Sequence, residues 1–231
     1  MIKGENSEGK CVNCLTRSAC AISVLNGDEL RKTRRIVHQF ACGADEIIFH
    51  QDEQALGAYI LCQGRAKLLY RAQNGKKLLL RFCSPGDLLA GIASQEHAFA
   101  AVSVGPCVVS FIDKTHATTL IRQNPELCLE IGRRFAQDGQ RLLQRMADLA
   151  YGSVEERLSR MLLELGEEHG VRGEKGLRID LPLFVHDLAD MTGCSRQTAS
   201  RELHRFAKRG WIDIMQHTIT LVNIEDLRRL G

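Results

Sequence analysis

The sequence lacks the features of secreted and membrane-spanning proteins. Residues 1–10 are polar and contain no basic region, apolar stretch or small-residue cleavage site. The longest apolar runs, such as residues 78–80 and 108–112, are the size of strands, whereas a membrane helix needs roughly 18 apolar residues. We therefore expect a cytoplasmic protein with no membrane contact.

Motifs of the common enzyme chemistries are also missing. The chain has no phosphate-binding loop, no nucleophile elbow and no zinc-protease motif, so we expect no catalytic activity. The net charge of +3 is too small to mark a nucleic-acid-binding protein, and any basic surface must be local. With 231 residues, of which 44% are hydrophobic, the chain is long enough for two globular domains.

Cysteine, in contrast, is plentiful, and three of the nine cysteines form a C-x2-C-x5-C run at Cys11, Cys14 and Cys20. In a chain without secretory features such a cluster indicates metal or redox chemistry rather than structural disulfides. The other six are Cys42, Cys62, Cys83, Cys107, Cys128 and Cys194.

Residues 45–112 contain short apolar runs separated by turn residues, which predicts a β-sandwich or roll. Asn74-Gly75 predicts a two-residue type I′ hairpin, because both central positions of that turn need a positive φ.

A helical pattern then begins after Pro125 and continues to about residue 150. Apolar side chains recur there every seven residues, with Gly132 and Gly139 also seven apart. The stripe predicts either a dimer seam or a helix packed on its own sheet. The seam residues would be Ile131, Phe135, Leu142, Met146 and Leu149. Asp138 and Arg145 fall near this seam, where they could pair across a two-fold axis or be solvated.

A second domain begins at Ser153, whose Ser-x-x-Glu pattern is that of a capping box. We expect a helix, a loop over residues 167–175, a strand over 179–183, a helix over 184–191, a turn over 192–194 and a second helix capped by Ser195 that reaches about residue 209. A hairpin of residues 211–215 and 218–222 follows, which completes a winged helix-turn-helix.

The second of these helices has the chemistry of a DNA reader. Arginine donates two hydrogen bonds to guanine, and glutamine pairs with adenine. A solvated basic face is the alternative. The expected base-contacting residues are Arg196, Gln197, Ser200 and Arg201, and the expected phosphate-contacting residues are Arg205, Lys208 and Arg209.

These features together resemble the cyclic-AMP receptor protein/FNR superfamily of bacterial transcription regulators, along nearly the whole chain. The resemblance is carried by the predicted roll, Ser-Pro-Gly-Asp at 84–87, the long helix and Cys-Ser-Arg-Gln-Thr-Ala-Ser-Arg at 194–201. It implies an α+β fold with an N-terminal β-roll like a cyclic-nucleotide-binding jelly roll, a long dimerisation helix and a C-terminal winged helix-turn-helix. The implied domains are residues 1–28, 29–124, 125–152 and 153–231.

The N-terminal cysteine spacing is similar to that of the oxygen-sensing FNR branch, in which three clustered cysteines and a fourth from the roll hold a [4Fe–4S] cluster. By that resemblance the ligands are Cys11, Cys14, Cys20 and Cys107, with Cys42 as the alternative fourth ligand. The implied protein is a homodimer that binds an inverted repeat of double-stranded DNA and works with RNA polymerase. A thiol–disulfide switch, a zinc site on the same residues, or a structural zinc protein remain alternatives.

Cyclic AMP is not expected as a ligand. Its binders in this superfamily place a Gly-Glu pair and an arginine after the corresponding turn, whereas no arginine occurs here between Arg81 and Arg122. The cyclic phosphate would therefore lack its charge partner. His50 and His97 are interpreted as surface or loop residues.

Overall fold

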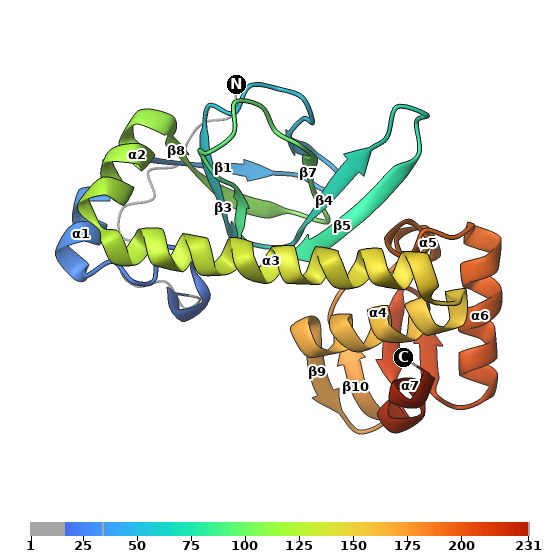
Figure 1. Cartoon of the computed structure of the whole chain (residues 1–231). Helices are drawn as coiled ribbons and strands as arrows, with labels where there is room; N and C mark the ends of the chain where they lie inside the picture. Colours follow the sequence, from blue (N-terminus) through green and yellow to red (C-terminus); the bar gives the residue numbers. More distant parts are fainter. Residues whose placement is uncertain (1–16, 34, 231) are drawn as a thin grey trace. The chain divides into compact units, whose positions relative to one another are not determined.

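The computed structural model describes residues 17–33 and 35–230 (Figure 1). The chain divides into two compact units, with the boundary between Asp138 and Gly139. Each unit is described by itself. In the described part of the chain, no helix is long and apolar enough to cross a membrane.

The first unit is a β-roll built from two four-stranded sheets, of order β1-β8-β3-β6 and β2-β7-β4-β5. A short helix η1 (Arg17–Ala19) and helix α1 (Gly27–Thr33) precede the sheets, and α2 (Lys114–Gln123) follows them. The strands are β1 (Val37–Cys42), β2 (Ile47–Phe49), β3 (Gly57–Gln63), β4 (Ala66–Arg71), β5 (Lys77–Cys83), β6 (Leu88–Ala90), β7 (Ala100–Ser103) and β8 (Cys107–Asp113). The predicted roll is confirmed.

Alternation along the strands assigns side chains to the inside or the outside of the roll. Leu61 and Val109 belong to the core between the sheets. Their neighbours Cys62 and Ser110 lie on the outer face, where their side chains contact each other. Leu25 and Leu30, from the segment before β1, form a separate apolar cluster with residues of α2 and α3.

The hairpin at Asn74-Gly75 is confirmed, but its turn type is not. Gly75 has a φ of 79°, whereas Asn74 is absent from the positive-φ residues of the described chain. The Gly75 N–H donates to Ala72 O, and Ala72 N–H donates to Lys76 O. The connection is therefore a three-residue loop with glycine in the left-handed position rather than a two-residue type I′ turn.

Helix α3 (Pro125–Tyr151) matches the predicted long helix. In the second unit α4 (Val154–His169) begins at Ser153, where the predicted capping box with Glu156 is present. The remaining elements are β9 (Gly170–Gly173), β10 (Gly176–Ile179), α5 (Val185–Thr192), α6 (Arg196–Lys208), β11 (Ile212–Met215), β12 (Thr218–Leu221) and α7 (Ile224–Leu230).

The strands of the second unit form one sheet of order β11-β12-β10-β9. The predicted wing hairpin is confirmed as β11 and β12. The expected loop over 167–175 is wrong, because buried His169 continues α4 and residues 170–173 pair with β10. The strand expected over 179–183 is displaced, since β10 ends at Ile179 and Leu177 pairs with Leu221.

The structure corrects the expectation for His97 in part. It lies in a loop as expected, but its side chain is buried and stacks on Phe49 with ring centroids 4.1 Å apart. Burial lowers its pKa. An uncharged imidazole packs like an aromatic ring, so His97 is part of the core rather than of the surface.

Candidate DNA interface and cysteine pocket

A tight turn sets the direction of helix α6. Helix α5 ends at Thr192 and is capped by Gly193. The φ of Gly193 is 63°, in the left-handed region where glycine is preferred. Two residues later the Ser195 hydroxyl accepts a hydrogen bond from Thr198 N–H at 3.1 Å and caps α6. On the inner face of α6, Ala199, Leu203 and Phe206 are buried. The opposite face is consequently left to solvent.

The four side chains expected to read bases lie together on that free face. Arg196, Gln197 and Arg201 are exposed and Ser200 is half-buried. All four line one shallow, open stretch of the surface. The structure thus brings together the polar donors and acceptors that base recognition requires.

Glu202 organises the basic side chains of α6, and the sequence reasoning missed it. Its carboxylate is buried, accepts from Arg205 Nη1 at 3.0 Å and accepts from Arg201 Nε at 3.3 Å. Burial raises the pKa of Glu202, but these hydrogen bonds outweigh burial and leave the pKa below its usual value. The sequence did contain a clue to this role. Glu202 is an acidic residue in a basic helix and directly precedes the apolar Leu203.

The three residues expected to meet phosphates differ in their surroundings. All three are exposed, but Arg205 is held by Glu202 and Arg209 donates to Glu155 at 2.7 Å. The Arg209 guanidinium also lies 4.7 Å from the centre of the Trp211 ring. Lys208 is exposed at the last position of α6.

The apolar stripe of α3 is exposed in the isolated chain. Phe135, Leu142, Met146 and Leu149 are 48%, 46%, 66% and 43% exposed. A Cβ placed on Gly132 or Gly139 would meet no atom within 4 Å, so this side of the helix is open.

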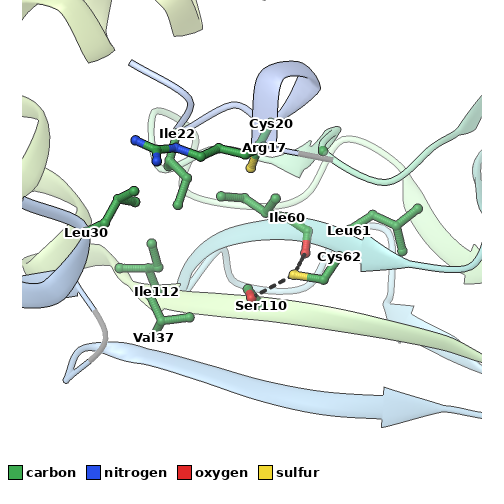
Figure 2. Close-up of a pocket in the computed structure, with 11 residues that line it drawn as sticks. Arg17, Cys20, Ile22, Leu30, Val37, Ile60, Leu61, Cys62, Ser110 and Ile112 are labelled. Carbon is green, nitrogen blue, oxygen red and sulfur yellow. Dashed lines mark hydrogen bonds between the residues drawn. The ribbon is translucent and has the colours of Figure 1, made fainter. Parts of the chain in front are cut away.

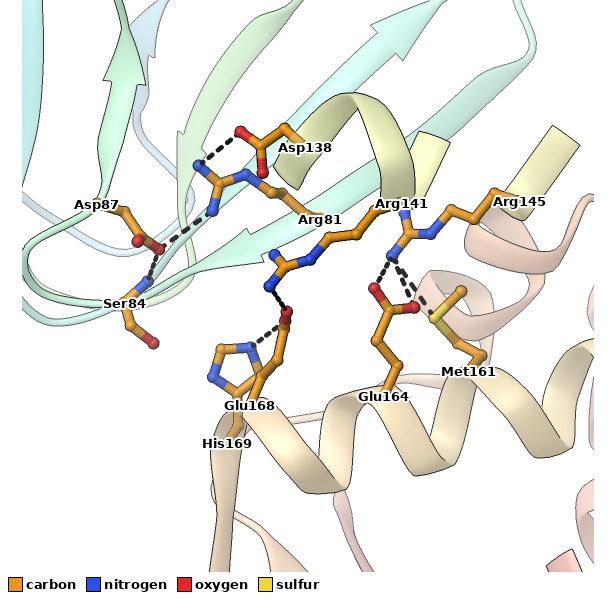
Figure 3. A network of polar contacts seen from close by, with 10 residues as sticks. All are labelled: Arg81, Ser84, Asp87, Asp138, Arg141, Arg145, Met161, Glu164, Glu168 and His169. Carbon is orange, nitrogen blue, oxygen red and sulfur yellow. Dashed lines mark hydrogen bonds and ion pairs between the residues drawn. The ribbon is translucent and has the colours of Figure 1, made fainter. Parts of the chain in front are cut away.

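The remaining seam residue, Ile131, and the two charged residues near the seam contact their own units. Ile131 packs partly buried against the cluster that contains Leu30. Asp138 pairs with Arg81 at 3.8 Å in the first unit, and Arg145 pairs with Glu164 at 3.2 Å in the second (Figure 3). The polar interruptions of the stripe are therefore intrachain ion pairs.

Cys20 lines a pocket on the outer face of the roll. The opposite wall includes Cys62 of β3 and Ser110 of β8 (Figure 2). The space open to a water-sized sphere is about 30 Å³, which holds roughly one water. The remaining lining is Arg17, Ile22, Leu30, Val37, Ile60, Leu61, Gly86 and Ile112.

Cys107, the expected fourth ligand, lies on the other face of the same sheet. It is 3% exposed in the core of the roll and stands opposite Cys42 in the β1–β8 register. Burial, together with the neighbouring Cys42 thiol, raises the pKa of Cys107 to about 12. The structure therefore does not bring Cys107, or its alternative Cys42, to the pocket of Cys20.

The remaining cluster ligands can be placed only in part. Cys11 and Cys14 lie outside the described residues. Among the residues that are described, no group of three histidine, cysteine or acidic side chains could hold a metal ion. Two thiols of the described chain, Cys20 and Cys62, share one pocket. Cysteine thiolates are the ligands that hold iron–sulfur clusters, and this pocket supplies two cysteines.

The backbone around Cys20 packs against the Ser-Pro-Gly-Asp turn. Gly86 has a φ of 102°, and a Cβ there would lie 2.7 Å from Ala19 O and 3.0 Å from Cys20 Cα. Glycine is therefore required for this close approach. Ala21 N–H donates to Gly86 O at 2.9 Å.

The same turn is tied to β3 and to α3. Gly86 N–H donates to Leu61 O at 2.7 Å, directly before Cys62. Asp87 accepts from Arg81, whose guanidinium also pairs with Asp138 of α3 (Figure 3). Arg134 of α3 donates to Ala19 O at 2.9 Å and to Gly86 O at 3.4 Å. Contacts thus lead from the residues beside Cys20 to the long helix.

Comparison with known proteins finds two domain families in the chain. Residues 40–124 match the cyclic nucleotide-binding domain, and residues 156–230 match the Crp-like helix-turn-helix domain. The CRP-like cAMP-activated global transcriptional regulator of Mycobacterium tuberculosis is 26% identical over 185 residues, which are 79% of this chain and 83% of that protein. The anaerobic regulatory protein of Aggregatibacter actinomycetemcomitans is 24% identical over 96% of this chain and 87% of its own length.

A solved structure shows the same fold. FixK2 from Bradyrhizobium japonicum superposes with a TM-score of 0.77 at 22% identity, over 85% of this chain and 98% of that chain. The domain matches and the transcription regulators among the relatives identify the activity class. The chain is a DNA-binding transcription regulator of the CRP/FNR family.

Proposed function

We propose that this regulator is a homodimer whose DNA affinity is controlled by a labile [4Fe–4S] cluster held by its N-terminal cysteines and one cysteine of the roll. The observation that carries this proposal is the seating of Cys20, whose neighbours Ala19 and Ala21 bond to the Ser-Pro-Gly-Asp turn and to α3. When bound, the cluster is itself the group that reacts with oxygen and is lost.

The protein's part in this control is to convert the position of the Cys20 segment into a change at α3. Arg134 is the direct link, because one guanidinium contacts the carbonyls of both Ala19 and Gly86. Its Nε is fixed by Glu130 at 2.8 Å. A ligand can shift an equilibrium only through contacts that differ between two states. The Ala19–Arg134 contact is the candidate for that difference.

Two copies of α6 in a dimer would read an inverted repeat with half-sites about one helical turn apart. The exposed stripe of α3 supports dimerisation through this helix. Cytoplasmic action with RNA polymerase is part of the proposal by family resemblance. Names among the relatives point in two directions, to cyclic AMP and to anaerobic control. The cysteine run and the lack of an arginine over residues 82–121 favour the second.

The experiment that tests this function compares the DNA affinity of protein purified without oxygen before and after exposure to air, together with its iron and sulfide content. A zinc-bound or thiol–disulfide regulator is the second candidate, because Cys20 and Cys62 share a pocket without needing iron. Zinc in colourless protein would favour it.

Replacing Arg134 with alanine is expected to separate cluster binding from DNA control. The Ala21 N–H should exchange with solvent at least about tenfold faster, because the segment loses a charge-assisted contact. Iron content should stay unchanged, while the difference in DNA affinity between anaerobic and air-exposed protein should shrink. Hydrogen exchange and binding titrations measure both.

Arg133→Ala is the matched control for this substitution. Arg133 precedes Arg134 on the same helix and also pairs with Glu130, but its side chain is 63% exposed. The control should behave like the unaltered protein. If Arg134→Ala retains the full response of DNA affinity to air, the contact with Ala19 does not transmit the signal.

A further inference from the structure

We propose that Cys62, rather than Cys107, is the roll's thiolate ligand to the cluster. This inference rests on the proposed function and names the residue that completes its site. Cys62 comes from the middle of the sheet, in β3, and neither the spacing of the sequence nor the family resemblance selects it.

The face of the sheet decides between the two cysteines. Cys20 and Cys62 line the same pocket on the outer face (Figure 2). Cys107 and Cys42 lie in the core between the two sheets, among residues such as Leu61 and Val109. Because strand residues alternate between faces, a shift of β8 by one residue would be needed merely to turn Cys107 to the outer face. That shift would also move Val109 out of the core.

Polar neighbours of Cys62 are placed to support a thiolate. Ser110 Oγ lies 2.9 Å from Cys62 Sγ, and Gln39 Nε2 lies 3.6 Å from it. Gln39 Nε2 also donates to Ser110 Oγ at 3.0 Å. Hydrogen bonds to the ligand sulfurs tune the potential of iron–sulfur clusters. Gln39 Oε1 is buried and accepts no hydrogen bond from the described residues, which marks an unusual polar site on this face.

The size of the pocket adds a consequence for control. Its open space of about 30 Å³ suits roughly one water, so a cluster bound between Cys20 and Cys62 requires the Cys20 segment to move outward. The segment is seated on Gly86 and bonded to Arg134. Ligation by Cys62 would therefore alter the contact with α3.

The experiment compares three serine variants of the full chain, purified without oxygen. We expect Cys62→Ser to lose most of the iron, sulfide and visible absorbance, and Cys107→Ser to keep them. Cys128→Ser is the control, because Cys128 is exposed on α3 and outside both cysteine groups. Thermal unfolding and light scattering of each variant show whether it folds and assembles like the unaltered chain.

A second variant tests the same site without removing a ligand. Ser110→Ala keeps Cys62 but deletes its hydroxyl partner, and the cluster should bleach in air several-fold faster than in the unaltered protein. Loss of iron in Cys107→Ser with retention in Cys62→Ser, or an unchanged bleaching rate in Ser110→Ala, would overturn the assignment while leaving the proposed function intact. Unaltered protein without iron and sulfide would refute both.

Discussion

Replacing Arg201 with alanine is expected to weaken binding to the preferred half-site by about 1–3 kcal/mol, or roughly 5- to 150-fold, and to remove discrimination at one base pair. Arg201 is exposed on the open surface that it shares with Arg196, Gln197 and Ser200. Glu202 holds its Nε at 3.3 Å and so limits the orientations of its guanidinium. A positioned guanidinium donates two hydrogen bonds to guanine, and alanine donates none.

Selection from random DNA measures this effect base by base. The unaltered protein should enrich a guanine opposite Arg201. At the base opposite Gln197 it should show either a preference for adenine or a relaxed base preference. Lys208→Ala is the control. Loss of a phosphate contact should weaken binding to all sequences alike and should reduce the dependence of DNA affinity on salt concentration. An unchanged motif with Arg201→Ala would show that α6 does not read bases through this residue.

Replacing Leu142 with glutamate is expected to convert the dimer into monomers. Leu142 is 46% exposed in the isolated chain, so the protomer itself should fold normally. In a dimer through α3 the new carboxylate would be buried without a partner, at a cost of several kcal/mol. DNA affinity should fall as well, because each protomer would bind one half-site without the second anchor.

Light scattering and titration of a two-site DNA measure this change. Gln140→Glu is the control, because it places the same charge on an exposed position of α3 about 160° around the helix from Leu142. It should remain dimeric. A dimer mass for Leu142→Glu equal to that of the control would show that the chain associates through another surface.

The sequence predicted the elements that depend on local chemistry. The bounds of α3, the capping box at Ser153 and the turn between α5 and α6 follow from apolar periodicity and capping residues, and all are present. The helices α1 and α2 were not predicted. They are short, of 7 and 10 residues, and α1 leaves little periodicity to detect.

Features that depend on long-range packing were not predictable in the same way. A heptad pattern placed Asp138 and Arg145 near the seam, but only the fold shows that Arg81 and Glu164 pair with them. Which cysteine of the roll lies near Cys20 also depends on long-range packing. Sequence spacing says how far Cys62 and Cys107 lie from Cys20, whereas strand order and register decide which of them faces it.

The most direct test of the central claim is the affinity of anaerobically purified protein for an inverted-repeat DNA, measured before and after air. The protein should be brown, with about four iron and four sulfide per chain. Its DNA affinity should change by at least about tenfold as the colour fades, a coupling of about 1.4 kcal/mol. Equal affinity in the two states, or colourless anaerobic protein with zinc in place of iron, would contradict control by an iron–sulfur cluster.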